Sequence, residues 1–283
     1  GLVDHPTRAR AVVGAGDLVG WLREAGHTSV SLPDETIGAD EKVEADAFAE
    51  GMDLVVSVGG DGTLLRGSEL ARRADVPLLG VNEGRLGFLT AVDPPEARGL
   101  LEAALQGSAP IEERMAIEAH PEDCPWEGAQ WALNEVMVEK HARHRLIALS
   151  LHVDGEYVTS LAADGVIVAT PTGSTAYSFS ARGPIVSPRL SCLLLTPVSP
   201  HMVFDRSIVL DPREEVVVEC LGDEPGYVSA DGRPGLELPV GGRLRIRRAE
   251  RPARLVRRPA TQSFYGLVRE KFNLPSDDRA RPG

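Results

Sequence analysis

A short run of glycines with one aspartate is the part of this sequence best suited to phosphate chemistry. Gly59, Gly60, Asp61 and Gly62 follow an apolar, β-branched run, and a helical pattern resumes near Thr63. Glycines allow backbone N–H groups to approach an anion closely, and the N-terminus of a helix adds a favourable dipole. The pattern therefore predicts a phosphate-binding turn between a strand and a helix.

The aspartate in this turn needs a role of its own, because a carboxylate repels a bound phosphate. Asp61 could accept the proton of a hydroxyl group that attacks a phosphoryl group, or help to hold Mg²⁺ against the phosphates. The simpler alternative is an ordinary Asp-Gly turn. Such a turn needs neither two preceding glycines nor a threonine at a helix start, so the sequence favours the phosphate site.

A second candidate site combines an aspartate, several hydroxyl groups and a tyrosine. After Asp164 an apolar strand runs to Pro171, and a short helix is expected to begin near Ser174. The turn between them carries four hydroxyl groups, on Thr170, Thr172, Ser174 and Thr175. One hydroxyl is enough to cap a helix, so the cluster is better suited to reading ribose hydroxyls and a base, with Tyr177 as a stacking surface.

Three further features have both a functional and a simpler interpretation. Asn134 and Glu135 interrupt a strand-like run, either as part of a site or as polar groups that face water. Arg85, in a glycine-containing loop after a buried strand, either reaches a phosphate or is an ordinary loop arginine. Asp231 with Gly232 has the local pattern of a hairpin turn.

Composition limits the classes of function. The chain has 283 residues, of which 42% are hydrophobic and 25% charged, as in a globular protein of one large or two ordinary domains. A net charge of −12 argues against general binding to nucleic acid or to an anionic membrane. The three cysteines are widely spaced and fit neither a disulfide framework nor a metal cluster, so we expect a cytoplasmic protein without dedicated metal ligands. We expect no membrane span and no signal segment.

Strands and helices alternate up to about residue 112. The pattern predicts helices near 17–25, 45–50, 64–74 and 94–106, strands at 28–32, 53–58 and 77–82, and no strand in the first ten residues. This alternation is typical of an α/β domain with a doubly wound, mostly parallel sheet, in which ligands bind at the carboxyl ends of the strands.

After about residue 112 the pattern predicts consecutive strands without helices between most of them. Strands are predicted at 115–120, 131–139, 145–153, 156–160, 191–198, 207–210, 214–221 and 226–230, with a hairpin turn at Asp154 and Gly155 and a solvated basic strand face at 243–247. An amphipathic helix at 263–272 is expected to return to the first domain. The predicted domains are therefore 1–112 (α/β, phosphate-binding), 113–255 (mainly β) and 256–283 (a segment that packs on the first domain).

Together these motifs resemble those of the NAD kinases, in particular bacterial and actinobacterial members. The glycine-aspartate motif also occurs in diacylglycerol kinases, sphingosine kinases and phosphofructokinases, whereas the threonine-rich motif that follows Asn134 and Glu135 is specific. The resemblance extends from about residue 53 to 272. It is carried by 59–63, 80–82, Gly84, 86–89, 133–135 and 164–177.

The resemblance implies transfer of a phosphoryl group from ATP, or from polyphosphate in some bacterial members, to the 2′-hydroxyl of the adenosine ribose of NAD. Mg²⁺ or another divalent cation would neutralise the donor phosphates, and the 113–255 domain would bind NAD. Relatives are commonly homodimers or homotetramers, with no nucleic-acid or membrane partner.

Roles follow residue by residue from the resemblance. Asp61 matches the proposed general base, and the glycine turn lies beside the NAD pyrophosphate and the incoming phosphates. Apart from the resemblance, we expect the residues that bind the substrates in this region to be Gly59, Gly60, Gly62, Thr63, Arg66 and Arg85. Phe88 matches a residue that lines the adenine pocket.

The second set of matching residues concerns the nucleoside parts of NAD. Asn134 and Glu135 match the pair that binds the adenosine portion, and Asp164 matches an aspartate near the ribose and nicotinamide end. Asp231 matches a late aspartate near the site. The turn that contacts the base and ribose is matched by Thr172, Thr175, Ala176, Tyr177 and Ser180.

The sequence departs from the family pattern at one position, and two other functions were weighed against NAD kinase. Arg182 stands where relatives usually have glycine, before Gly183. A lipid kinase would share the glycine-aspartate turn, but the acidic chain and the threonine-rich turn speak against it. A non-catalytic NAD(P)-binding regulator is the other alternative, against which Asp61, Asn134 and Glu135 argue.

Overall fold

The structure, a computed structural model, describes residues 1–4, 9–82, 87–142, 144–201, 205–258 and 263–275. The chain divides into two compact units, which are described separately below. Unit 1 comprises Gly1–Glu113 with Ala253–Gly283, and unit 2 comprises Arg114–Pro252. The predicted boundaries at 112 and 255 lie within the two strands of unit 1 next to the division, β6 (Ile111–Arg114) and β19 (Ala253–Val256).

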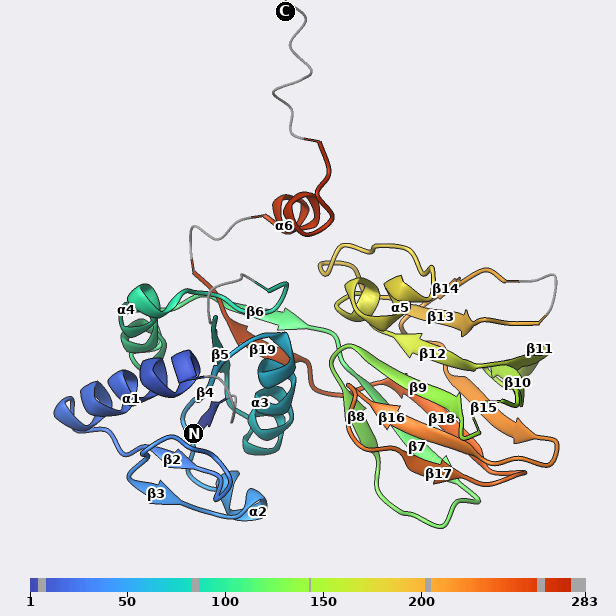
Figure 1. Ribbon diagram of the computed structural model, residues 1–283, viewed down its shortest axis with the longest axis horizontal. Coiled ribbons are helices and arrows are strands. Elements are labelled where there is room, and N and C mark those ends of the chain that lie inside the picture. Colours follow the sequence, from blue (N-terminus) through green and yellow to red (C-terminus); the bar gives the residue numbers. More distant parts are fainter. Residues whose placement is uncertain (5–8, 83–86, 143, 202–204, 259–262, 276–283) are drawn as a thin grey trace, which may run out of the picture. The chain divides into compact units, whose positions relative to one another are not determined.

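Unit 1 is built on a seven-stranded sheet with the order β3-β2-β1-β4-β5-β19-β6 (Figure 1). Neighbours from β3 through β19 pair in parallel, which confirms the predicted doubly wound, mostly parallel sheet. The other strands are β1 (Leu2–Asp4), β2 (Val30–Ser31), β3 (Glu41–Lys42), β4 (Val55–Val58) and β5 (Leu78–Val81). The helices are α1 (Ala9–Glu24), α2 (Ala45–Phe48), α3 (Asp61–Ala74), α4 (Pro94–Leu105) and α6 (Phe264–Lys271).

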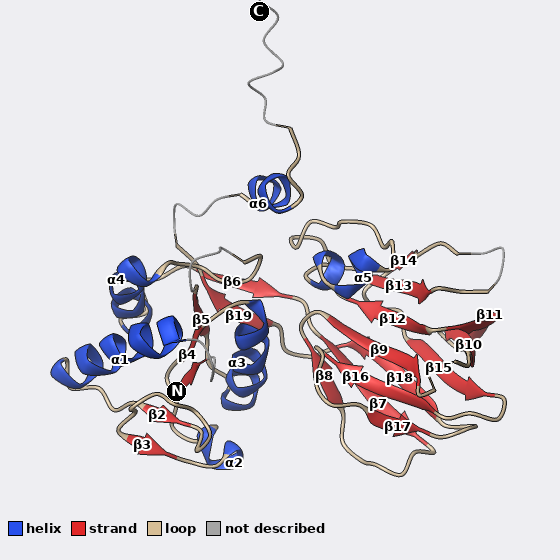
Figure 2. Ribbon diagram, viewed as in Figure 1, coloured by secondary structure: helices blue, strands red, loops and turns tan. Residues whose placement is uncertain are grey.

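Helices cover both faces of this sheet (Figure 2). On one face Leu18 of α1 and Leu101 of α4 pack in the same buried cluster as Val56 of β4 and Leu79 of β5. On the other face α3 packs against β4, and a Cβ on Gly67 would lie 3.1 Å from a side-chain carbon of Leu78. Because both faces are covered, all four residues of β4 are buried, as expected for a parallel strand.

The prediction that the first ten residues hold no strand is wrong. β1 occupies Leu2–Asp4 and pairs in parallel with both β2 and β4. Three residues are too few to show a period of two, and the strand exists because its two neighbours hydrogen-bond it on both sides.

Unit 2 is a pair of six-stranded antiparallel sheets. Their orders are β11-β10-β15-β18-β7-β8 and β14-β13-β12-β9-β16-β17. The first sheet contains β7 (Ile117–Glu122), β8 (Gln130–Ala132), β10 (Ile147–Val153), β11 (Glu156–Ala163), β15 (Val216–Leu221) and β18 (Arg243–Arg248). The second contains β9 (Glu135–Lys140), β12 (Gly165–Ala169), β13 (Leu193–Val198), β14 (Ile208–Leu210), β16 (Gly226–Ala230) and β17 (Leu236–Leu238). A short 3₁₀ helix (Gly173–Thr175) and α5 (Tyr177–Ser180) follow β12.

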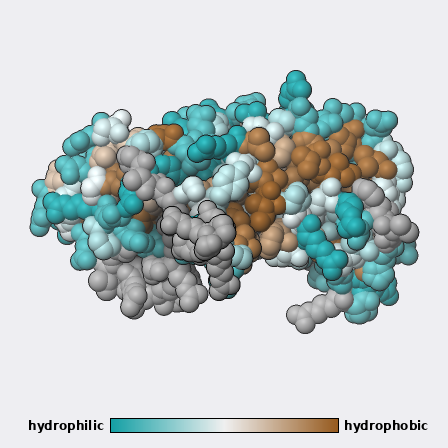
Figure 3. Space-filling model, turned by 90° about the horizontal axis from the view of Figure 1, so that it is seen from above, coloured by the Kyte–Doolittle hydropathy of each residue, from teal (hydrophilic) through white to brown (hydrophobic). Residues whose placement is uncertain are grey.

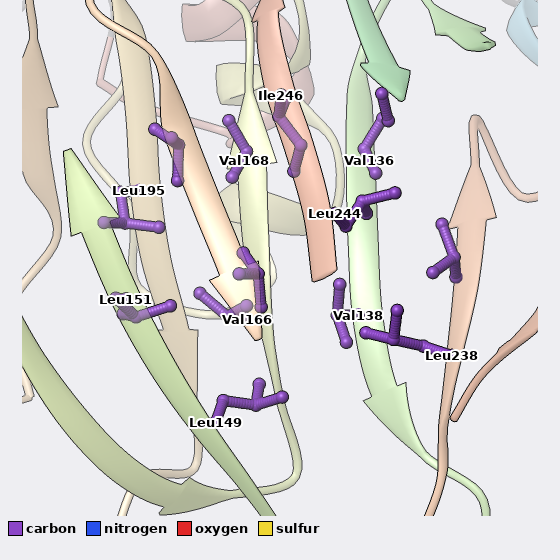
Figure 4. Close-up of a cluster of buried hydrophobic side chains, with 14 of the residues drawn as sticks. Val136, Val138, Leu149, Leu151, Val166, Val168, Leu195, Leu238, Leu244 and Ile246 are labelled. Carbon is purple, nitrogen blue, oxygen red and sulfur yellow. The ribbon is translucent and has the colours of Figure 1, made fainter. Parts of the chain in front are cut away.

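One apolar core joins the two sheets of unit 2 (Figure 4). Val136 and Val138 of β9 lie in it together with Leu244 and Ile246 of β18, and all four side chains are buried. In each strand these are alternate residues, because successive side chains of a strand point to opposite faces. The mainly β second domain predicted from the sequence is therefore a two-layer structure.

The predicted single strand at 131–139 is in fact two strands. β8 ends at Ala132 and pairs with β7, whereas β9 begins at Glu135 and pairs with β12 and β16 of the other sheet. The chain changes sheet at Leu133 and Asn134. A continuous apolar pattern conceals such a change, because both strands contribute to the same core.

Some apolar side chains of unit 2 remain at the surface. Figure 3 shows apolar residues gathered on one face of the molecule. The exposed large apolar side chains of this unit include Phe179, Ile185, Leu190 and Val209. Among the described residues, none of the helices has the length and apolar character needed to cross a bilayer.

Candidate functional site

The glycine turn of unit 1 lies at the carboxyl end of β4. β4 ends at Val58, Gly60 is the N-cap, and α3 begins at Asp61. The Gly59 N–H donates to the Val81 carbonyl at 2.9 Å. A Cβ on Gly59 would lie 2.5 Å from Oγ1 of Thr63, so the close approach of this side chain requires glycine. The predicted sequence of strand, glycine turn and helix is confirmed.

The Asp61 carboxylate is held by the loop that follows β5. Oδ2 accepts a hydrogen bond from the Phe88 N–H at 3.0 Å, and Oδ1 accepts one from the Leu89 N–H at 3.2 Å. A Cβ on Gly87 would clash with this carboxylate. The Gly87 N–H donates to Oγ1 of Thr90 at 3.0 Å, which fixes the same loop. The loop therefore fixes the orientation of the Asp61 carboxylate.

The Arg66 side chain of the phosphate region contacts two other segments of unit 1. Its Nη2 lies 2.6 Å from Oε1 of Glu35, and its Nη1 donates to the Asp4 carbonyl at 3.3 Å. Glu35 also accepts from the Asp4 N–H at 2.9 Å, and burial raises the pKa of Glu35 to about 7. Arg66 thus links α3 to the carboxyl end of β1. Arg85, the other predicted phosphate-binding arginine, lies outside the described residues.

Phe88 packs among the rings of the C-terminal helix. Its ring centroid lies 6.1 Å from that of Phe264 and 6.4 Å from that of Phe272. The helix begins after Ser263, whose hydroxyl accepts from the Gly266 N–H at 3.1 Å. The final helix therefore contacts the loop that holds Asp61.

In unit 2, Asp231 fixes the point where the chain changes sheet. Its carboxylate accepts hydrogen bonds from the N–H groups of Leu133, Asn134 and Glu135, at 2.7, 2.8 and 3.2 Å. Asp231 and Gly232 both have positive φ, 50° and 69°, so the predicted turn is also correct. Asp231 serves both as a turn residue and as the acceptor that presents Asn134 and Glu135.

Glu135 is an acid whose pKa lies well above its ordinary value. Burial, followed by the nearby charge of Asp231, raises the pKa of Glu135 to about 8, and a hydrogen bond from the Tyr177 N–H offsets part of this effect. Burial also raises the pKa of Asp231, but three backbone N–H groups favour its charged form. The three N–H donors therefore stabilise the charged form of Asp231, while burial opposes it.

The interpretation of the hydroxyl cluster needs correction for two of its members. Thr170 Oγ1 donates to the Leu133 carbonyl at 2.6 Å, and Ser174 Oγ donates to the Pro171 carbonyl at 2.7 Å. Both side chains are fully buried. These hydroxyls shape the turn and are not available to a ligand. A sequence pattern cannot distinguish them from their neighbours, because it does not show which hydroxyls face inward.

The same turn packs directly on the Asn134 backbone. The Thr170 N–H donates to the Asn134 carbonyl at 2.8 Å, and a Cβ on Gly173 would clash with that carbonyl. Thr172 is buried, and its Oγ1 accepts from Arg114 at 3.3 Å. The structure thus brings Asn134, Glu135 and Asp231 together with the turn that carries the remaining predicted residues Thr175, Ala176, Tyr177 and Ser180.

A cavity of about 430 Å³ opens in unit 2 beside Tyr177. An ion pair between Lys140 and Asp164 lies in its wall and lowers the pKa of Asp164. His141 and Tyr227 stack in the same wall, with ring centroids 4.6 Å apart. The cavity is lined by Met137, Glu139, Lys140, His141, Asp164, Tyr177, Tyr227 and Gly235.

No sequence motif marks Lys140, His141 or Tyr227 as residues of this cavity. Lys140 reaches Asp164 because β9 and β12 are antiparallel with Glu139 opposite Gly165. Tyr227 lies opposite Glu139 on the other side of β9. These contacts depend on strand register, for which the sequence alone carries no local signal. No group of three or more acidic, histidine or cysteine side chains in the described part of the chain is arranged to hold a metal ion.

Comparisons with known proteins cover both units. The chain matches the family models of the ATP-NAD kinase N-terminal domain over residues 16–109 and the ATP-NAD kinase C-terminal domain over residues 133–258. NAD kinase 2 of Streptomyces avermitilis is 40% identical, with 97% of this chain and 94% of that protein covered. NAD kinase of Geotalea daltonii is 39% identical, with 93% and 94% covered.

Two solved structures share the fold. An NAD kinase from Archaeoglobus fulgidus in complex with ATP superposes with a TM-score of 0.72 at 26% identity, and the match covers 97% of this chain and 99% of that one. A yeast NADH kinase complexed with NADH gives a TM-score of 0.87 at 24% identity, with 97% and 87% covered. The second likeness concerns the fold alone.

Proposed function

The chain belongs to the NAD kinase family, and from this we propose that it transfers a phosphoryl group from ATP or polyphosphate to the 2′-hydroxyl of the adenosine ribose of NAD, giving NADP. Asp61 is the residue that accepts the proton of the attacking hydroxyl. The glycine turn receives the phosphates, and the residues around Asn134 and Glu135 receive the adenosine portion.

The fixed orientation of Asp61 is the observation that carries this proposal. Each carboxylate oxygen accepts one backbone N–H, from Leu89 and from Phe88. A carboxylate has about four acceptor positions, so both oxygens keep one for a substrate hydroxyl. Phosphoryl transfer depends mainly on positioning and electrostatics, and a base that is already oriented needs little reorganisation when the reaction occurs.

The surroundings of Asp61 fit a magnesium ion that enters with the donor. Mg²⁺ is usually bound by one or two carboxylates together with substrate phosphates, and it keeps several waters. Among the described residues the turn offers one carboxylate, that of Asp61, which agrees with this mode. When bound, the ion would neutralise the charge of the donor phosphates.

In unit 2 we assign the two ends of NAD to different groups. Asn134 and Glu135, whose N–H groups the Asp231 carboxylate holds, support binding of the adenosine portion together with the turn of Thr172 and Thr175, which packs on the Asn134 backbone through the Thr170 N–H. The cavity beside Asp164 and Tyr177 supports binding of the nicotinamide end, since it offers an aromatic wall and a charged pair.

The direct test is NADP formation from NAD, ATP and Mg²⁺, read with an NADP-specific dehydrogenase, with polyphosphate as donor in a parallel reaction. We expect Asp61→Asn to keep its affinity for NAD and to lose at least a hundredfold in turnover, the lower end of what a positioned general base contributes being about 10². Asp223→Asn, an exposed turn aspartate, is the matched control and should keep full activity. Full turnover in Asp61→Asn would exclude the assigned role.

Assembly and location are further parts of the proposal. We propose a homodimer or homotetramer, supported by the exposed apolar side chains of unit 2 such as Phe179 and Leu190. Sedimentation velocity tests it, and a monomer at micromolar concentration would contradict it. We also propose a cytoplasmic enzyme, supported by the three free cysteines, Cys124, Cys192 and Cys220. Cell fractionation with an antibody to the protein tests this location.

Neither alternative gains support from the comparisons. A lipid kinase or a non-catalytic NAD(P)-binding regulator would be favoured by relatives with such names, whereas the curated relatives described above are named NAD kinase. Measured turnover with NAD would exclude the regulator.

A further inference from the structure

Leu89 is hydrogen-bonded through both of its backbone polar groups. Its N–H donates to Oδ1 of Asp61 at 3.2 Å, and its carbonyl accepts from Nη1 of Arg257 at 2.7 Å. Leu89 is buried, so its carbonyl depends on a partner within the protein. Among the described residues, that partner is the Arg257 side chain. Leu89 thus connects the proposed base to an arginine that lies 168 residues further along the chain than Leu89 itself.

Arg257 is held in place by segments next to β19. It follows directly after β19, which lies between β5 and β6 (Figure 1). Its Nε donates to Oε2 of Glu112 in β6 at 2.5 Å, and its backbone N–H donates to the Pro110 carbonyl at 2.8 Å. Its side chain is only 13% exposed. The guanidinium group is therefore a fixed donor and not a mobile surface charge.

The other hydrogen bonds of the loop hold it on each side of Leu89. The N–H groups of Gly87 and Ala91 both donate within unit 1, at 3.0 and 2.9 Å. Neither bond satisfies the Leu89 carbonyl. Without Arg257 this buried carbonyl would lack a donor, and the loop would have to turn it toward water. The Leu89 N–H would then move away from the carboxylate that accepts from it.

The two side-chain hydrogen bonds of Arg257 use different nitrogens of one rigid group. Nη1 donates to the Leu89 carbonyl, and Nε donates to Glu112. A guanidinium group presents its N–H donors in a planar fork, whereas a lysine ammonium is a single point on a flexible stem. The contact with Glu112 therefore sets the direction of the Nη1 donor, which lysine at this position would not reproduce.

We propose that Arg257 is a positioning residue for phosphoryl transfer, which acts through the Leu89 backbone to hold the Asp61 carboxylate toward the attacking hydroxyl. This inference rests on the proposed function, in which Asp61 is the base. Arg257 itself touches no substrate. The C-terminal part of the chain thereby contributes to the chemistry at the glycine turn, and displacement of a catalytic group by about 1 Å is enough to lower a rate about a hundredfold.

The first experiment compares two arginines of the same segment. Arg257→Met loses the bond to Leu89, so we expect kcat to fall about tenfold to a hundredfold, with KM for NAD and for ATP within about twofold of the wild type. Arg254→Met is the matched control, because Arg254 lies on β19 but pairs with Asp75 at 3.0 Å, and it should keep wild-type kcat.

A conservative variant covers the case in which Arg257→Met does not fold. Arg257→Lys keeps the charge and one donor but loses the rigid fork. We expect its kcat to lie between those of Arg257→Met and the wild type, about tenfold below the wild type, at an unchanged melting temperature. Wild-type kcat in folded Arg257→Met, or in Arg257→Lys where the first variant does not fold, would overturn the inference.

A double-mutant cycle with Asp61→Asn shows whether Arg257 acts through the base. If it does, Arg257→Met should lower kcat less than about twofold in the Asp61→Asn background, because the base that it would misplace is already gone. An equal fold-loss in both backgrounds would overturn the inference. A KM for ATP raised about tenfold in Arg257→Met would also overturn it, since that result indicates a direct contact with the donor.

Hydrogen–deuterium exchange gives a readout that does not depend on turnover. Arg257→Met should speed amide exchange in peptides that cover residues 87–92, and Arg254→Met should leave it unchanged. Unchanged exchange in this loop of Arg257→Met would overturn the inference while leaving the kinase activity intact. Absence of NADP formation by the wild type with either donor would instead overturn the proposed function.

Discussion

The carboxylate of Asp231 accepts a hydrogen bond from the backbone N–H of Asn134 at 2.8 Å, although 97 residues separate the two along the chain. With the neighbouring bonds to Leu133 and Glu135, it satisfies three consecutive N–H groups where the chain passes from one sheet to the other. These donors would otherwise lack strand partners. The turn at Asp231 thereby positions Asn134 and Glu135, which lie far from it in the sequence.

Replacement of this carboxylate should affect both stability and NAD affinity. In Asp231→Asn the amide nitrogen would face N–H donors, so at least one N–H group loses its acceptor. We expect a loss of about 1–3 kcal/mol in the free energy of unfolding, measured in urea, and a KM for NAD raised about tenfold or more. Asp154→Asn is the matched control, because Asp154 also starts an Asp-Gly turn with positive φ. Among the described residues its carboxylate accepts from one N–H group, that of Glu215, at 2.8 Å. An unchanged KM in Asp231→Asn would contradict the positioning role.

A methyl group at Gly87 should displace the proposed base without unfolding the protein. The added Cβ clashes with the Asp61 carboxylate, and the backbone of Gly87 does not have positive φ, so alanine suits the local conformation. We expect Gly87→Ala to lower kcat about a hundredfold, as a misplaced catalytic group commonly does. Gly99→Ala, where a Cβ meets nothing within 4 Å, should keep its activity. Wild-type kcat in a folded Gly87→Ala protein would show that the Asp61 orientation is unimportant.

Replacement of Arg182 by glycine should make the folded protein more stable. Its φ is 68°, a left-handed conformation that costs a non-glycine residue about 1–2 kcal/mol, and its side chain is exposed. We therefore expect Arg182→Gly to raise the free energy of unfolding by about 0.5–1 kcal/mol, after the larger entropy of an unfolded glycine is deducted. Arg189→Gly, exposed and without positive φ, should lower it instead. A loss of stability in Arg182→Gly would mean that the arginine side chain makes a compensating contact.

The buried Glu35 should make unit 1 less stable as pH rises. Its pKa is raised from an ordinary value of 4.5 to about 7, chiefly by burial, so the folded state holds a proton that the unfolded state has released. Stability is then greatest below pH 4.5, as far as this group is concerned, and declines as pH rises through about 7. Glu35→Gln should flatten the pH dependence of the melting temperature between pH 5 and pH 8. Glu41→Gln, an exposed acid on β3, should leave it unchanged, and an equal slope in wild type and Glu35→Gln would contradict the assignment.

Much of the fold could be predicted because its signals are local. The change from β-branched residues to glycines and then to a helical pattern located β4, the turn and α3. Pro94 and Gly107 marked the limits of α4, and the Asp-Gly pairs marked hairpin turns. In each of these cases the residue type itself restricts the backbone.

The features of the fold and the site that the sequence does not predict depend on contacts between distant segments. The three-residue strand β1 exists only through its neighbours β2 and β4. The pairing of Lys140 with Asp164 follows from the register of β9 and β12. The burial of Thr170 follows from the packing of its turn on Leu133 and Asn134, between β8 and β9, and Ser174 is buried in the same turn. Arg182 departs from the glycine that relatives usually have, but only the backbone angles show that this residue has positive φ.

The order of strands in the first sheet has a consequence for how the protein forms. β19, from residues 253–256, lies between β5 and β6, and Leu255 pairs with Leu78. During translation β5 and β6 are synthesised early. β19, the strand that separates them, is synthesised only after all of unit 2. Closing so long a loop carries an entropic cost and slows folding. Until then the edges of β5 and β6 remain open to mispairing, so the newly made N-terminal part of the chain is the stage at which this protein most needs a chaperone.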